Sequence, residues 1–205
     1  MRKYLPHILI ISFVFIAIPI TSATGGSITL RSYYRNLSVS EVHSMPNVSM
    51  RVRDEYGFSG HSIINHNYNF KTIGGDKVVV DKATGLMWHQ NGSDDSMRYK
   101  KVKKWIRKLN KRGYAGYQDW RLPTVEEAAS LLESRKKNEG LYIDPFFGDE
   151  SFIWTGDEFD DGSGDAWGVD FLDGGVRTTT ESWCPHFLHK MDGKCFCVRP
   201  VRSME

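Results

Sequence analysis

The sequence predicts an α+β protein in which two helices pack on antiparallel strands, preceded by a short N-terminal extension. Two segments with the apolar spacing of a helix lie close together, at residues 102–109 and 125–132. Runs of β-branched and aromatic residues lie on both sides of them, separated by Gly- and Asp-rich turns. Because the two helices are adjacent and do not alternate with strands, the order favours α+β over repeated βαβ units.

The N-terminus has the order of a cleaved secretory signal. Arg2 and Lys3 form a positive region, the apolar run Ile8–Ile20 follows, and Thr21–Ala23 supplies the small residues of a cleavage site. This run is shorter than the ~20 apolar residues that a membrane-spanning helix needs, although an uncleaved anchor is the alternative. We expect removal of residues 1–23, no stable membrane span afterwards, and a periplasmic or extracellular protein.

The expected mature chain divides near residue 77. Residues 24–76 are polar and weakly patterned, so we interpret them as an extension that packs on the domain that follows. Its one clear element is a short helix, which begins at the capping-box pair Ser38 and Glu41 and stops at Pro46. Residues 77–205 form the domain itself.

The domain opens with a predicted hairpin. Val78–Val80 and Leu86–Trp88 flank the turn sequence Asp81–Gly85, a pattern that is typical of two short antiparallel strands. After the helices, further strands are expected at Phe152–Trp154, Ala166–Phe171, Val176–Thr180 and Lys194–Val201.

Each of the two helices has local start or stop signals. Gly113 is a plausible C-terminal stop for the first helix. The second begins at the capping-box pair Thr124 and Glu127, with Pro123 just outside it. The apolar stripe of the first helix is Val102, Trp105, Ile106 and Leu109, and that of the second is Val125, Ala128, Leu131 and Leu132.

Charge is divided unevenly along the chain. From Arg98 to Arg112 there are nine basic residues and no acidic one, whereas from Glu139 to Asp173 there are eleven acidic residues and no Lys or Arg. Such segments suggest polyanion binding, association between copies, or mutual neutralisation. Within the acidic segment, the loop Asp157–Asp165 offers oxygen ligands for Ca²⁺, although an exposed hairpin turn is the simpler interpretation.

The basic helix is the clearest candidate binding surface. Like charges four residues apart destabilise a helix, and a bound polyanion would relieve that repulsion. The alternatives are a solvated face or one neutralised by the acidic segment. The candidate ligand-binding residues are Lys100, Lys101, Lys103, Lys104, Arg107, Lys108, Lys111 and Arg112.

Several ordered motifs resemble those of the DUF1566 or Lcl C-terminal domain family, which is named after a collagen-like bacterial adhesin. The similarity covers about residues 77–202. The resemblance implies a C-type-lectin-like fold, related to the formylglycine-generating enzyme superfamily, in envelope or secreted proteins, and binding of sulfated polysaccharide. Ile106 stands where many relatives have a cysteine, and the collagen stalk is absent. The matching motifs are Asp81–Trp88, Gly116–Thr124, Trp154–Thr155, Ala166–Trp167, Phe171–Gly175 and Cys197–Arg199.

The most specific of these motifs has a structural interpretation. Trp120 can enter the core just before the second helix, while Asp119 and Arg121 can hold buried carbonyl groups or each other through charge-assisted hydrogen bonds. Pro123 and Thr124 then start the helix. A direct contact with a ligand is the alternative for these residues.

The three cysteines lie near the C-terminus. In an oxidising compartment we expect one disulfide, between Cys184 and Cys195, because Cys195 and Cys197 alternate along an expected strand and are poorly placed to bridge each other. Together with His186 and His189 the same cysteines are an alternative Zn²⁺ or copper site. No metal or other cofactor is part of the leading hypothesis.

The leading hypothesis is an exported, non-enzymatic, adhesin-like binding module for acidic or sulfated polysaccharide, or for another polyanion of host or envelope. No Gly-x-Ser-x-Gly elbow, phosphate loop or His-Glu-x-x-His motif is present. No nucleic-acid partner is expected. The alternatives are a structural component of the envelope that pairs with a protein through its basic and acidic faces, and a metal-dependent enzyme or metal-binding protein.

Overall fold

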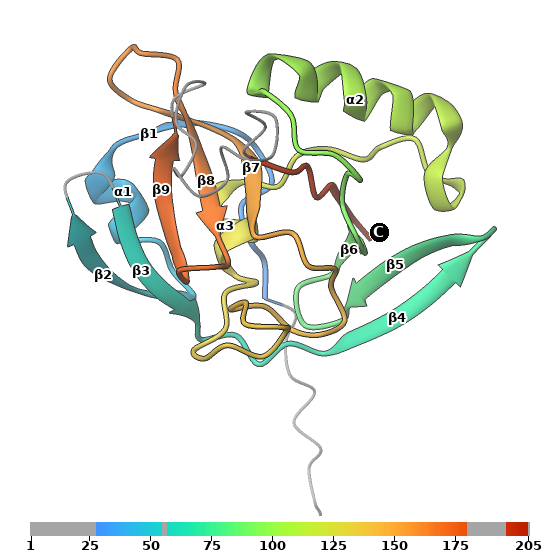
Figure 1. Cartoon of the computed structure of the whole chain (residues 1–205), viewed down its shortest axis with the longest axis horizontal. Helices are drawn as coiled ribbons and strands as arrows, with labels where there is room; N and C mark the ends of the chain where they lie inside the picture. Colours follow the sequence, from blue (N-terminus) through green and yellow to red (C-terminus); the bar gives the residue numbers. More distant parts are fainter. Residues whose placement is uncertain (1–27, 55–56, 180–195, 205) are drawn as a thin grey trace, which may run out of the picture.

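A six-stranded and a four-stranded sheet, both curled, form the framework of the molecule (Figure 1). The computed structural model describes residues 28–54, 57–179 and 196–204. In the six-stranded sheet β1 is parallel to β7, and the other neighbours are antiparallel. Its order is β1 (Asn36–Leu37), β7 (Phe152–Phe159), β8 (Ala166–Asp170), β9 (Gly175–Thr179), β3 (Gly57–Ser62) and β2 (Val48–Asp54).

The four-stranded sheet contains the hairpin that the sequence predicts. The hairpin is confirmed by the register, which pairs Val79 with Trp88 and Asp81 with Leu86, and Gly85 takes the left-handed conformation of its turn with φ 69°. The domain's last strand returns to pair antiparallel with β6. The order is β10 (Val201–Ser203), β6 (Leu86–His89), β5 (Asp76–Asp81) and β4 (Tyr68–Ile73).

The long helix α2 (Tyr99–Arg112) confirms the first predicted helix. Val102 and Leu109 are buried, whereas Trp105 and Ile106 are partly buried at the edges of the core. Gly113 ends the helix in the left-handed conformation, with φ 70°, and the short 3-10 turn η1 (Tyr114–Gly116) follows. In Figure 1 α2 lies at the upper right, above the four-stranded sheet.

The second predicted helix, α3 (Val125–Ala129), is confirmed in position but is shorter than its apolar pattern suggested. The capping box of Thr124 and Glu127 is present. After Ala129 the chain tightens into i→i+3 hydrogen bonds, from the Leu131 and Leu132 N–H groups to the Ala128 and Ala129 carbonyls. Beyond the helix, the Ser130 carbonyl accepts from His66 Nε2 at 2.7 Å and the Leu132 carbonyl accepts from the Ser62 N–H at 2.8 Å, so neither continues the helix. α3 lies centrally and packs against β7 and β8.

The N-terminal segment is more structured than the sequence indicated. Helix α1 (Val39–His43) has the expected capping box of Ser38 and Glu41. The same segment also supplies β1 to β4, which no local pattern revealed, and β3 pairs with β9 at Phe58 and Val176. The segment therefore contributes strands to both sheets.

The end of the chain differs from the expected strand Lys194–Val201. Between residues 196 and 200 the structure shows a single bridge, Cys197 to Ile153, and β10 starts only at Val201. Pro200 has no N–H to give to a ladder. The Arg199 side chain is fully buried beside Glu150. The other two late strands, β8 and β9, agree with expectation to within one residue.

Export of the protein and cleavage of its signal peptide stay predictions. The signal peptide, residues 1–23, lies outside the described residues. Within the described ranges, none of the helices has the length and apolar character that crossing a membrane requires.

His89 makes the stability of this framework depend on pH. Its ring stacks on Tyr114 with centroids 4.1 Å apart, and Nδ1 accepts from the Gly92 N–H at 2.9 Å. Burial, together with the charges of Arg199 and Arg112, lowers the pKa of His89 to about 3. The imidazole is therefore neutral in the native state at neutral pH.

We expect His89 to remove stability as the pH falls. The unfolded chain binds this proton near pH 6.5 but the native state does not, so stability is greatest above pH 6.5 and is lost towards pH 3. At pH 5 the loss from this group is about 2 kcal/mol. His89→Asn keeps an acceptor for Gly92 and should lose less stability between pH 7 and pH 5 in urea titrations. Parallel losses in the variant and the parent protein would contradict the assignment.

Candidate functional site

The basic face of α2 is open to solvent. All eight candidate side chains, from Lys100 to Arg112, are exposed. Arg112 pairs with Asp76 at 3.0 Å. Lys103 and Arg107 make no ion pair with any described carboxylate. These two residues are one helical turn apart, and both line a surface groove that runs beside α2.

The acidic segment forms ion pairs with arginines outside α2. Asp157 pairs with Arg31, Glu150 with Arg199, and Asp170 with Arg177. These three carboxylates are buried or nearly so. These three carboxylates of the acidic segment are therefore neutralised by arginines that lie outside α2.

A groove of about 470 Å³ runs beside α2. One wall is α2 itself, and the other is formed by β7 and by an N-terminal strap, which we define as residues 28–37. Most of the lining is apolar, from Val102, Ile106 and Leu122 together with aromatic rings. The aromatic residues are Tyr34, Tyr99 and Trp120, and the cationic ones are Arg35, Lys103, Arg107 and Arg121.

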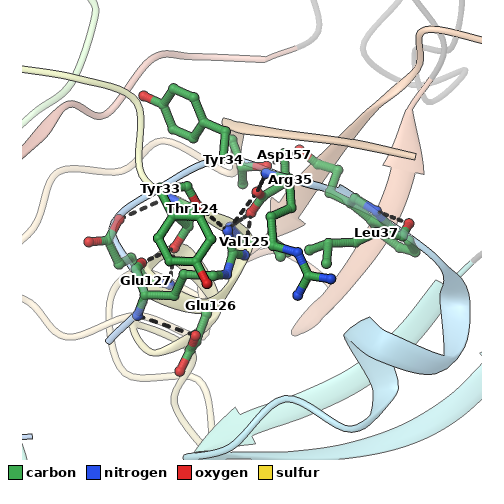
Figure 2. Close-up of polar contacts among 12 residues, drawn as sticks. Tyr33, Tyr34, Arg35, Leu37, Thr124, Val125, Glu126, Glu127 and Asp157 are labelled. Atoms are coloured by element: carbon green, nitrogen blue, oxygen red, sulfur yellow. Dashed lines mark hydrogen bonds and ion pairs between the residues drawn. The ribbon is translucent and has the colours of Figure 1, made fainter. Parts of the chain in front are cut away.

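The strap is held in place by the carboxylate of Asp157 in β7 (Figure 2). Arg31 donates to its two oxygens at 2.8 and 2.7 Å, and the Arg35 N–H donates at 2.7 Å. The Val125 N–H, in the first turn of α3, donates at 2.7 Å. Asp157 is completely buried, so these four hydrogen bonds satisfy a charge that has no access to water.

The other strap contacts extend this attachment. Burial lowers the pKa of Arg31, but the hydrogen bonds and charge of Asp157 outweigh burial and leave the pKa above its ordinary value. Thr124 Oγ1 donates to the Arg31 carbonyl at 2.9 Å. Farther along, Trp167 Nε1 donates to the Leu37 carbonyl at 3.0 Å, and Leu30 and Leu37 are buried. The strap is thus part of the core as well as of the groove.

The Asp119–Thr124 motif supports the floor of the groove. Trp120 is buried, and its Nε1 donates to the Tyr114 carbonyl at 2.9 Å. Arg121 does not pair with Asp119; it forms two hydrogen bonds of 2.7 Å with Glu127 and one with the Leu122 carbonyl. Asp119 pairs instead with Arg202 at 2.8 Å. Pro123 accepts through its carbonyl from the Gly156 N–H.

A Ser–His–Asp arrangement lies in a second depression, of about 220 Å³, that the sequence did not suggest. His66 Nδ1 is 2.7 Å from Asp81, and Nε2 is 3.3 Å from Ser62 Oγ. However, Nε2 is also 2.7 Å from the Ser130 carbonyl, which can only accept. Nε2 therefore carries a proton and cannot act as the base that activates Ser62.

The remaining cysteine and metal predictions have different outcomes. Cys184, Cys195, His186 and His189 lie outside the described residues, so the expected disulfide and the alternative metal site stay predictions. Cys197 is a free thiol, and burial raises its pKa to about 11. Ile106 packs against the buried apolar cluster that contains Phe196 and Val198.

The acidic loop Asp157–Asp165 does not converge on a cation. Asp157 is directed inward to Arg31, whereas Asp160 and Asp161 are exposed. Nowhere in the described ranges do three His, Cys, Asp or Glu side chains come together as a metal site.

These features define a mixed α+β protein with a cationic, aromatic-lined surface groove. The chain belongs to the Lcl C-terminal domain family, whose model matches residues 77–202. Comparisons with curated proteins and with solved structures give no significant match. The strap, α1 and β1 to β4 precede the matched range.

Sequence reasoning missed the strap residues Arg31, Tyr34 and Asn36 and the role of Asp157. One local signal was present, because the exposed aromatic and polar run from Tyr33 to Asn36 is enclosed by the buried residues Leu30 and Leu37. The residues that hold the strap are far from it in the sequence: Asp157, for example, is 126 positions from Arg31.

We expect Asp157→Asn to destabilise the protein by about 3 kcal/mol, because it removes the buried negative charge that Arg31 pairs with and places an amide NH₂ among donors that need an acceptor. It should also expose the strap to trypsin at Arg31 and Arg35. Urea unfolding and timed proteolysis measure the two effects. The matched control is Asp161→Asn in the exposed loop after β7, which should change stability by less than about 0.5 kcal/mol. Equal stability of the two variants would refute the role of Asp157.

Proposed function

We propose that the protein is an exported, non-enzymatic module that binds acidic or sulfated polysaccharide. The observation that carries the proposal is the continuity of the exposed basic face of α2 with the aromatic-lined groove, at Lys103 and Arg107. A polysaccharide chain offers regularly spaced anionic groups to such a face and sugar rings to such a groove. Membership of the Lcl C-terminal domain family supports the same proposal.

A C-type-lectin-like fold is part of the proposal. The pairing of the last strand, β10, with the opening hairpin strand β6 closes the family domain on itself, which supports this assignment. The α3 helix packs on β3, β7, β8 and β9 of the six-stranded sheet, and the Asp119–Thr124 motif leads directly into it.

Two observations favour binding over catalysis. The Nε2 atom of His66 donates to the Ser130 carbonyl, so it offers Ser62 no basic lone pair of the kind that a Ser–His–Asp relay needs. The Cys197 thiol is partly buried, which raises its pKa to about 11, so it is not a thiolate nucleophile at neutral pH.

The second candidate function is a structural component of the cell envelope. The edge strand β2 exposes Val52 between Arg51 and Arg53, and an exposed strand edge can pair with another chain. Polysaccharide binding would depend on α2, whereas assembly through β2 would not. The metal-dependent alternative rests on cysteine and histidine residues outside the described ranges.

The test replaces Lys100, Lys101, Lys103 and Lys104 with Gln. Gln has nearly the helix propensity of Lys, and the apolar stripe of α2 is unchanged, so thermal stability should change little. Retention on immobilised heparin should fall to a much lower salt concentration, because exposed charges act through an attraction that salt screens. The matched control removes four exposed charges outside α2, at Lys71, Lys82, Arg135 and Lys136.

The control variant should elute close to the parent protein. If both variants elute together, binding depends on net charge and not on α2. If the parent protein is not retained on any acidic glycan, the proposal fails and the assembly function is favoured.

A further inference from the structure

We propose that the groove is a subsite for one anionic sugar residue, and that the N-terminal strap gives it selectivity for a sugar over a bare anion. The inference rests on the proposed function and deepens it. The groove has the dimensions of a small-molecule site, about 470 Å³. A surface that binds polyanions by charge alone does not need such a cavity.

The α2 wall is suited to the anionic group of the ligand. Lys103 and Arg107 are four residues apart, so their side chains lie on one face, about 6 Å apart along the helix. Val102 and Ile106 lie beside them and make the rest of that wall apolar. A sulfate or carboxylate placed between the two cations would leave its sugar ring against apolar and aromatic side chains.

The opposite wall is suited to hydroxyl groups. Asn36 of β1 and Glu158 of β7 are direct partners in the parallel register, so their side chains lie next to each other on one side of the sheet. An amide and a carboxylate accept hydrogen bonds from hydroxyl groups, and the amide also donates. A carboxylate in this position repels a bare anion. The combination therefore matches a ligand that is anionic at one end and hydroxylated at the other.

An amphiphile fits these walls less well. A fatty acyl sulfate could place its head group between Lys103 and Arg107, but its chain would then lie against the polar pair Asn36 and Glu158. Burying those polar groups without partners is unfavourable. The sugar is the better match for both walls together.

The strap sets the shape of the second wall. The Tyr34 hydroxyl donates to the Leu122 carbonyl at 3.0 Å, and its ring lies directly over Gly156. A Cβ atom on residue 156 would lie 2.1 Å from the ring of Tyr34, so Gly156 is required for this ring position. Tyr34 and Asn36 both precede the matched range of the family domain, residues 77–202, whereas Glu158 of the same wall lies within it.

The experiment compares two probes by calorimetric titration of the full mature chain. The probes are a fully sulfated heparin disaccharide and inorganic sulfate. We expect the disaccharide to bind at least tenfold more tightly than sulfate. Glu158→Gln should lower that ratio at least fivefold, because the sugar loses a charged acceptor while sulfate loses a repulsion. The matched control, Glu139→Gln, removes an exposed carboxylate outside the groove lining and should leave the ratio unchanged.

Gly156→Ala tests the strap separately. The new methyl group displaces the Tyr34 ring, and disaccharide affinity should fall about tenfold. Tyr34→Ala should weaken the disaccharide to a similar extent, so a folding defect at residue 156 alone does not decide the result. Retention of both variants on long-chain heparin should stay close to that of the parent protein, because the outer charges of α2 remain.

The outcomes separate the two proposals. Strong heparin retention with no disaccharide binding, or with affinities unchanged in Glu158→Gln and Gly156→Ala, would overturn the subsite and leave the proposed function intact. Tighter binding of decyl sulfate than of the disaccharide would identify an amphiphile site and also overturn it. If the parent protein is not retained on heparin at all, the proposed function itself fails.

Discussion

The buried carboxylate of Asp157 receives hydrogen bonds from Arg31, Arg35 and Val125, and through them it joins the strap, α3 and β7. A carboxylate without access to water is tolerated only when such partners surround it. The partners in turn are fixed, because moving any of them would leave the charge unsatisfied. The position of the strap is therefore tied to the helix at the centre of the family domain, and the groove wall depends on that tie.

The groove combines two walls that are stabilised in different ways. The α2 wall is anchored by apolar burial of Val102 and Leu109 and by the stop at Gly113. The strap wall is anchored mainly by polar contacts to Asp157 and by the burial of Leu30 and Leu37. Because Lys103 and Arg107 make no ion pair with any described carboxylate, they are available to a ligand at little cost in stability. This division explains how a helix rich in like charges persists on the surface.

Local signals in the sequence were sufficient for the elements whose determinants lie within a few residues. The stripe of α2, the capping box at Thr124 and the turn at Gly85 are of this kind. The strands β1 to β4 had no local signal that predicted them. The clearest case is β3, which has few apolar residues and whose partner β9 lies more than 100 positions further along the chain, as the pairing of Phe58 with Val176 shows. For the same reason the local sequence presents Asp157 as part of an acidic loop, although its role is set by the distant Arg31.

Hydrogen exchange at single amides tests the central claim most directly. The N–H groups of Arg35 in the strap and Val125 in α3 donate to the same buried carboxylate. If Asp157 holds both segments, these two amides should be strongly protected and should exchange with similar free energies of opening, well above that of the exposed loop at Asp161. Rapid exchange of the Arg35 amide together with slow exchange of the Val125 amide would show that the strap opens independently, and would contradict the account.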